Sequence, residues 1–121
     1  MNLDKQLIDK FVSVTSSAAA SCYKHVGKGN KLLADKAATD SMRESLNKLN
    51  IDGEVVIGEG ELDKAPMLYI GEKLGTGSGP SIDIAVDPLE GTNFAAKFVP
   101  SSGSTAISID GPLPVPNFSP I

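Results

Sequence analysis

The segment Asp83-Ile-Ala-Val-Asp-Pro-Leu-Glu-Gly-Thr92 decides how this chain is interpreted. It opens within a β-branched run over residues 82–86, which predicts a strand, and then passes directly into acidic, proline and glycine residues. The proline stiffens the exit of the strand, and Gly91 lets the backbone approach a ligand closely. A short helix expected over Thr92–Lys97 would offer its free N–H groups to a phosphate. The segment therefore predicts a binding site where a strand ends.

A second segment, Val56-Ile-Gly-Glu-Gly-Glu61, has the same order of a β-branched strand followed by glycine and acidic residues. Carboxylates at two strand ends can converge, and crowded carboxylates repel one another unless a cation neutralises them. Magnesium or manganese, which prefer oxygen ligands, would neutralise them. Two other interpretations stay open: the glutamates form a solvated hairpin tip, or Asp87-Pro88 is an ordinary strand exit. The carboxylates concerned are Glu59, Glu61, Asp63, Asp87 and Glu90.

The composition limits the classes of protein and of site. With 121 residues, 40% of them hydrophobic, the chain is expected to hold one globular domain. The formal net charge of −4 argues against an extended basic surface for nucleic acid. A single cysteine, Cys22, and a single histidine, His25, exclude an internal disulfide, a multi-cysteine zinc site and a histidine-based metal centre. Neither a membrane span nor a signal peptide is legible, so a cytoplasmic protein without a membrane partner is expected.

Two helices are expected before these segments. From Leu3 to about Val26, apolar residues recur at a spacing of three to four, which predicts an amphipathic helix that ends at glycine. A second helix is expected from Asp35 to Leu49, with Asp35 in the N-cap position. The apolar faces would consist of Leu3, Leu7, Phe11, Val14 and Ala18 in the first helix and of Ala38, Met42, Leu46 and Leu49 in the second.

The middle of the chain changes to the pattern of strands. Besides the two β-branched runs, Pro66–Gly71 is a further candidate strand, and Gly75–Pro80 is expected to be a flexible turn. Asp83 interrupts an apolar strand and is either buried against a partner or held behind the site. Helices followed by strands with charged tips predict an α/β fold, in which two helices pack on a mixed sheet and the site lies at the strand ends.

The end of the chain has a different composition. Residues 98–121 are rich in proline, serine and glycine, and only Ala106–Ile109 shows the alternation of a strand. The chain therefore divides into an ordered portion, residues 1–97, and a divergent tail, residues 98–121.

Taken together, these segments resemble the class II fructose-1,6-bisphosphatases of the lithium-sensitive, metal-dependent phosphatase superfamily. The resemblance runs from about residue 5 to Lys97 and also includes Ala65-Pro-Met-Leu-Tyr-Ile-Gly-Glu72 and Lys28-Gly-Asn-Lys31 with Ala34-Asp35. It implies the N-terminal part of the layered α/β carbohydrate-phosphatase fold, which fructose bisphosphatases share with inositol monophosphatases.

The resemblance also implies the roles of single residues. Asp35 and Glu59 would be ligands of one metal ion, manganese or magnesium, and Asp87 and Glu90 would be ligands of a second. Glu90, Gly91 and Thr92 would hold the reacting phosphate. Asp63 and Thr92 would orient and deprotonate the attacking water.

The implied reaction is hydrolysis of the 1-phosphate of fructose 1,6-bisphosphate to fructose 6-phosphate and phosphate, in gluconeogenesis and glycerol metabolism, by a homo-oligomer. Glu90 and the Ala65–Glu72 block argue against an inositol-monophosphatase-like activity, whereas a sedoheptulose-bisphosphatase activity stays open. The family's chains are longer than this one, and the sequence after Lys97 departs from their pattern. The chain is therefore expected to be truncated and to have little or no activity in isolation. A catalytically inactive fragment is the alternative from another class, and the length of the chain favours it.

Overall fold

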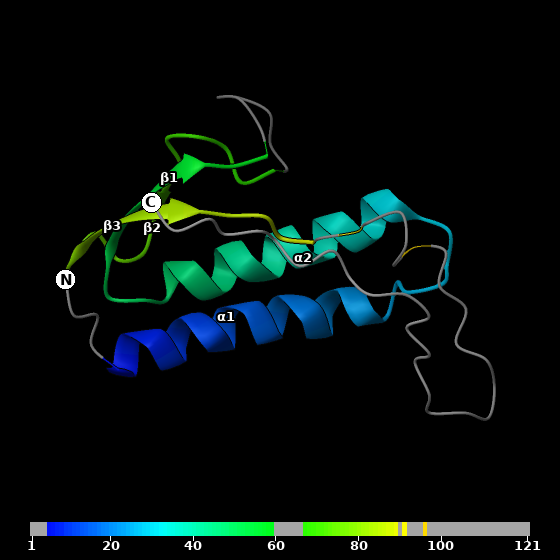
Figure 1. Cartoon of the computed structure of the whole chain (residues 1–121), viewed down its shortest axis with the longest axis horizontal. Coiled ribbons are helices and arrows are strands. Elements are labelled where there is room, and N and C mark those ends of the chain that lie inside the picture. The colour runs from blue at the N-terminus through cyan, green and yellow to red at the C-terminus, as the bar shows by residue number, and fades with distance from the viewer. Residues whose placement is uncertain (1–4, 60–66, 90, 92–95, 97–121) are drawn as a thin grey trace, which may run out of the picture.

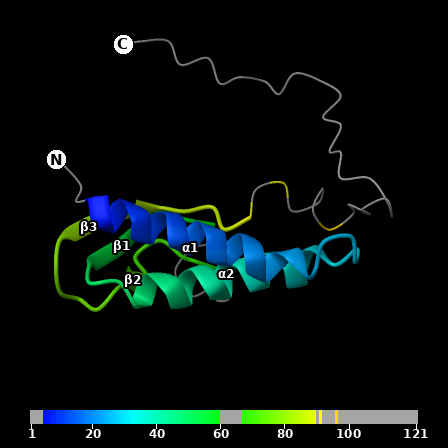
Figure 2. The same ribbon diagram turned by 90° about the horizontal axis from the view of Figure 1, so that it is seen from below.

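The computed structural model of the chain describes residues 5–59, 67–89, 91 and 96. Two helices run antiparallel side by side, and a small sheet lies at the end where the first helix begins and the second finishes (Figures 1 and 2). This arrangement confirms the predicted α/β fold of two helices followed by a mixed sheet. The elements are α1 (Lys5–Tyr23), α2 (Lys31–Asn47), β1 (Asp52–Ile57), β2 (Lys73–Leu74) and β3 (Ser81–Ala85).

The first helix follows its apolar spacing. Leu7, Val14, Ala18 and Cys22 are buried, and Phe11 is partly buried against the same core. The helix ends at Tyr23 rather than at Val26, and a turn leads to two glycines at positive φ, Gly27 at 73° and Gly29 at 71°. No helix among the described residues is long and apolar enough to cross a membrane.

The second helix begins earlier than predicted. Its N-cap is Asn30, whose side chain accepts a hydrogen bond of 3.1 Å from the Leu33 N–H. The N-cap predicted at Asp35 is therefore wrong, because a free helical N–H is already satisfied one turn earlier and Asp35 lies inside the helix. The predicted face is confirmed, since Ala38, Met42, Leu46 and Leu49 are all buried, although Leu49 lies past the helix end.

The sheet is mixed, with the strand order β2-β1-β3. β1 pairs antiparallel with β2 and parallel with β3. The candidate strand at Pro66–Gly71 is wrong for residues 67–71, where the backbone turns: Gly71 has a φ of 88°, and the Glu72 N–H bonds to the Tyr69 carbonyl. The strand forms two residues later, as β2.

A β-bulge alters β1 shortly before the acidic segment. Val55 is level with Ile84 and Ile57 with Ala85, so β1 has one extra residue, Val56, between these pairs. Simple alternation from the buried Val55 would place Ile57 in the core, yet its side chain is 64% exposed. The bulge therefore changes the direction of the side chains that follow, as bulges do beside functional sites.

The core lies between the helices and one face of the sheet. Ile51, Val55 and Leu68 are completely buried there. The predicted Thr92–Lys97 helix, the Ala106–Ile109 strand and the 98–121 tail lie wholly or almost wholly outside the described residues. The core cluster comprises Leu7, Val14, Ala18, Cys22, Ala38, Met42, Leu46, Leu49, Ile51, Val55, Leu68, Leu74 and Ile84.

Candidate active site

The two acidic segments leave the sheet at the same edge. β1 and β3 are parallel neighbours, and Ile57 is level with Ala85. Glu59 and Asp87 each follow two residues after that pair, and the Val86 N–H bonds to the Ile57 carbonyl at 2.9 Å, just before them. Both side chains are exposed. The parallel pairing therefore places two of the predicted ligands at one edge.

Asp35 approaches this edge from α2. Its half-buried carboxyl group has a raised pKa, first because burial disfavours the charged form and second because the negative charge of Asp87 lies nearby. Asp35 and Asp87 are far apart in the sequence and belong to different elements. The fold therefore brings together two carboxylates that the sequence assigned to two metal ions.

The chain after β3 stays close to the beginning of α2. The Gly29 N–H, in the loop between the helices, donates a hydrogen bond of 2.7 Å to the Ala96 carbonyl. Gly91, which was predicted to hold phosphate, has a φ of 66°, in a region that other residues rarely adopt. Leu89 packs partly against the core. Ala96 is thus held beside the loop that precedes α2, and Leu89 is held against the core.

The pair of Asp35 and Asp87 fits a cation. Burial and the nearby charge of Asp87 both oppose ionisation of Asp35, and a divalent ion with oxygen ligands would relieve that cost. Among the described residues, no group of three histidine, cysteine, aspartate or glutamate side chains is arranged to hold a metal ion. The predicted residues Glu61, Asp63, Glu90 and Thr92 lie outside the described residues, so the full ligand set stays a prediction.

The other acidic segment begins where two stretches of backbone pack closely together. The Glu59 N–H donates a hydrogen bond of 3.2 Å to the Leu68 carbonyl, and the Gly71 N–H donates one of 2.8 Å to the Val55 carbonyl. Gly58 allows this approach, since a Cβ at its position would lie 2.4 Å from the Leu68 oxygen. Glu59 and Leu68, which come before and after Asp63 in the sequence, are thus in contact with each other.

An ion pair that was not predicted from the sequence holds this same region in place. Arg43 Nε donates to Glu72 Oε1 at 2.6 Å and Arg43 Nη2 donates to Glu72 Oε2 at 3.2 Å. Arg43 Nη2 also donates to the Met67 carbonyl at 2.7 Å. The hydrogen bond to Glu72 raises the pKa of Arg43 above its ordinary value. The signal available in the sequence was an acidic residue, Glu72, at the end of the otherwise largely apolar Ala65–Glu72 block. The structure shows that this residue is buried.

Asp83 belongs to a different surface. It is exposed on β3, level with Glu54 of β1, so its predicted burial against a partner is wrong. Lys73 bonds to Glu54 at 2.6 Å, and its pKa is raised first by that hydrogen bond and also by the charges of Asp52 and Asp83. Asp83 therefore contributes to an exposed charged cluster on the sheet.

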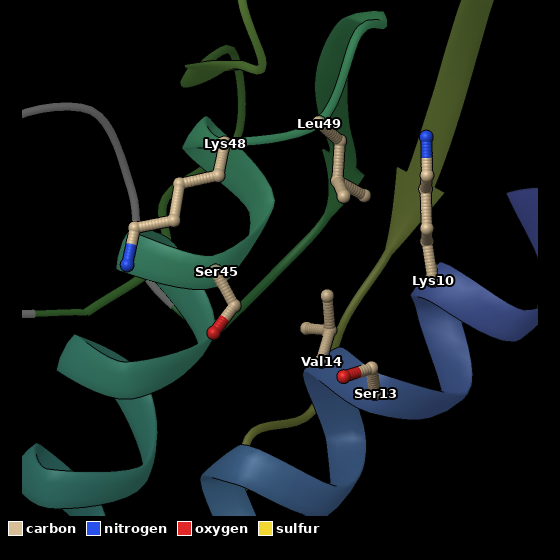
Figure 3. Close-up of a pocket in the computed structure, with 6 residues that line it drawn as sticks. All are labelled: Lys10, Ser13, Val14, Ser45, Lys48 and Leu49. Atoms are coloured by element: carbon tan, nitrogen blue, oxygen red, sulfur yellow. The ribbon is translucent and has the colours of Figure 1, made fainter.

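A cavity of about 190 Å³ lies elsewhere, between α1 and the end of α2. Figure 3 shows the amino groups of Lys10 and Lys48 at this cavity pointing in different directions, and Lys48 is paired with Glu44 at 2.6 Å. It lies at the end of α2 remote from Asp35. Nothing in its lining resembles the acidic site, so we do not assign the chemistry to it.

Comparison with known proteins shows which family the sequence matches. The model of the family described as bacterial fructose-1,6-bisphosphatase, glpX-encoded, matches residues 5–113. This match continues past Lys97, where the divergent tail was predicted to begin, and the division there stays a prediction.

Curated relatives carry names of the same kind. The chain is 59% identical over 92 residues to fructose-1,6-bisphosphatase 1 class 2 of Escherichia coli (strain K12), which covers 76% of this chain and 27% of that protein. It is 51% identical over 94 residues to D-fructose 1,6-bisphosphatase class 2/sedoheptulose 1,7-bisphosphatase of Synechococcus sp. (strain CC9902), covering 78% and 28%. It is 47% identical over 107 residues to fructose-1,6-bisphosphatase class 2 of Haemophilus influenzae, covering 88% and 31%. The chain thus spans less than a third of the length of these relatives.

Proposed function

Because the chain belongs to the bacterial, glpX-encoded fructose-1,6-bisphosphatase family, we propose that it takes part in the hydrolysis of the 1-phosphate of fructose 1,6-bisphosphate. The products are fructose 6-phosphate and inorganic phosphate, and the cofactor is manganese or magnesium. The observation that carries this proposal is that Asp35 of α2 lies within range of the charge of Asp87, at the edge where β1 and β3 end. Two acidic groups in mutual repulsion, in a chain of this family, suit a site that binds a divalent cation and a phosphate.

Each residue has a proposed task. Asp35 and Glu59 hold one cation, and Asp87 and Glu90 hold the second. Glu90, Gly91 and Thr92 hold the reacting phosphate, to which the backbone can come close because of the positive φ of Gly91. When bound, the cations lower the pKa of water and neutralise the charge that develops on oxygen.

The attacking water needs separate groups. Asp63 accepts its proton, and the Thr92 hydroxyl orients it toward phosphorus. Neither residue is a proposed metal ligand, so substituting either one separates the proton transfer from cation binding.

The setting of the proposed activity follows from the same family. We place the protein in the cytoplasm, in gluconeogenesis and glycerol metabolism, as a homo-oligomer that acts on a free sugar phosphate and on neither nucleic acid nor a membrane. The net charge of −4 is consistent with the absence of a nucleic-acid partner, since that role requires a basic surface.

A second substrate has its own support. The Synechococcus relative is named for both fructose 1,6-bisphosphate and sedoheptulose 1,7-bisphosphate, so the longer sugar is the second candidate. An inositol phosphate is disfavoured, because Glu90 and the Ala65–Glu72 block match the bisphosphatase pattern.

The deciding experiment measures phosphate release by the 121-residue chain and by a full-length version that carries the same residues. The substrates are fructose 1,6-bisphosphate, sedoheptulose 1,7-bisphosphate and inositol 1-phosphate, each with manganese, with magnesium and with a chelator. We expect metal-dependent release from the bisphosphates by the full-length version, with its loss in Asp87→Asn, and little or no release by the 121-residue chain alone. Release from inositol 1-phosphate alone would contradict the proposed substrate. Manganese binding without release from any sugar would identify a chain that keeps the metal site but does not catalyse.

A further inference from the structure

Arg43 joins α2 to residues 67–72, which lie close to the end of β1. Its guanidinium donates to both carboxylate oxygens of Glu72, at 2.6 and 3.2 Å, and to the Met67 carbonyl at 2.7 Å. Glu72 also accepts from the Tyr69 N–H at 3.3 Å. The Glu72 side chain is only 10% exposed and that of Arg43 is 25% exposed. One planar, two-pronged donor thus fixes both ends of residues 67–72.

The same segment is joined to β1 by its backbone. The Val55 N–H donates to the Glu72 carbonyl at 3.0 Å, and the Gly71 N–H donates to the Val55 carbonyl at 2.8 Å. The Leu68 carbonyl accepts from the Glu59 N–H at 3.2 Å, and the Leu68 side chain is completely buried. Glu59 is therefore connected to Arg43 through residues 67–72.

These connections relate two proposed ligands of one ion. Asp35 lies on α2 about two turns before Arg43. Glu59 follows β1, and at the level of the backbone α2 approaches β2 and not β1. The Arg43–Glu72 pair thus bridges α2, which carries Asp35, and the segment against which Glu59 is hydrogen-bonded.

We propose that Arg43 and Glu72 are positioning residues that set the place of Glu59 relative to Asp35, and so prepare the metal site. The inference rests on the proposed function. Arg43 touches neither metal nor substrate, and acts through Glu72 and the 67–72 segment. A lysine at this position would keep the charge but lose the two-pronged contact, so the arginine is required for its geometry.

The test uses Arg43→Lys, with Glu72→Gln as a second variant of nearly the same shape. The matched control is Lys73→Met, which breaks the Lys73–Glu54 pair of the same 2.6 Å length but on the exposed face. Two quantities are measured in the 121-residue chain. NMR gives the hydrogen-exchange rates of the Glu59, Gly71 and Val86 amides without metal, and a titration gives the dissociation constant of manganese.

We expect Arg43→Lys and Glu72→Gln to accelerate exchange at Glu59 and Gly71 by about tenfold more than at Val86. Val86 bonds to the other side of β1, at the Ile57 carbonyl, and so reports general stability. Residues that orient metal ligands typically contribute about 10- to 100-fold in affinity, so manganese should bind at least about tenfold more weakly in both variants. Lys73→Met should change neither quantity by more than about twofold.

Two results would overturn the inference. Equal acceleration at all three amides would reduce the pair to a general contribution to stability. Unchanged manganese affinity, despite faster exchange at Glu59, would show that Arg43 holds Glu59 in place but that this does not prepare the metal site. If the parent chain binds no manganese, the proposed function fails for this chain, while the exchange ratio still decides whether Arg43 fixes Glu59.

Discussion

The carboxyl group of Asp35, on α2, has a pKa that is raised first by burial and second by the nearby charge of Asp87, which follows β3. In the absence of a cation this relationship is unfavourable, because burial and a like charge both oppose ionisation of Asp35. Divalent cations held at Asp35 and at Asp87 would offset this repulsion. The effect of removing one charge therefore depends on whether metal is present.

Asp35→Asn should stabilise the chain slightly in a chelator, by about 0.5 kcal/mol for a partly solvated like-charge contact. The same variant should lose most of the rise in melting temperature that manganese gives the parent, since that rise depends on the binding constant. Thermal unfolding with and without manganese measures both effects.

Glu44→Gln is the control for Asp35→Asn. Glu44 lies on the same helix but is paired with the exposed Lys48, and should not bind the cation. Its loss should leave the manganese-induced shift unchanged. Equal shifts in the two variants would show that Asp35 is not a ligand.

Gly58→Ala should destabilise the chain by about 1–3 kcal/mol, because the added Cβ would meet the Leu68 carbonyl oxygen at 2.4 Å and force two backbones apart. Gly77→Ala is the comparison, since nothing lies within 4 Å of its Cβ and only its φ of 74° opposes the change. That backbone cost is about 1 kcal/mol. Urea unfolding shows which of the two variants loses more free energy of unfolding. A parental midpoint for Gly58→Ala would contradict the close packing.

Leu68→Ala should cost about 2–5 kcal/mol, because the side chain is completely buried and its loss leaves a cavity. Ile70, two residues later, is 48% exposed, and Ile70→Ala should change the free energy of unfolding by about 0.5 kcal/mol or less. Urea unfolding would separate the two. Similar losses of unfolding free energy in the two variants would mean that Leu68 does not anchor residues 67–72 to the core.

Thr92→Ala should lower kcat by about 10²- to 10⁴-fold in a chain that hydrolyses fructose 1,6-bisphosphate, since it removes a group that orients water and no metal ligand. Glu59→Ala should instead shift the manganese concentration needed for half-maximal rate, with partial recovery at high manganese. A manganese titration of both variants beside the parent distinguishes these effects. A parental kcat for Thr92→Ala at saturating metal would remove Thr92 from the mechanism.

Much of the architecture was predictable because it depends on local order. The spacing of Leu7, Val14 and Ala18 puts them on one face of α1, and a helix with such a face buries it wherever it docks. The β-branched runs at residues 55–57 and 82–86 predicted β1 and β3 to within a few residues. Positive φ at Gly75, Gly77 and Gly79 confirms the turn predicted from glycine spacing.

The errors have long-range or competitive causes. Both Asn30 and Asp35 are good cap residues by type, and only the structure shows that Asn30 takes this role, by accepting from the Leu33 N–H. The apolar Met67–Gly71 stretch resembles a strand, but a turn closed by Glu72 prevents it. The apolar neighbours of Asp83 suggested either burial against a partner or a place behind the site, whereas strand alternation places it on the exposed face.

The sequence by itself determined the family, the order of helices and strands, and the acidic residues that end two strands, because motifs and periodicity are properties of neighbouring residues. Only the tertiary structure decided that Asp35 meets Asp87, that a bulge changes the direction of β1 before Glu59, and that Arg43 pairs with Glu72. These relationships join residues from different elements. Their free energy comes from contacts that exist only after α2 and the sheet have packed together, so no local pattern records them.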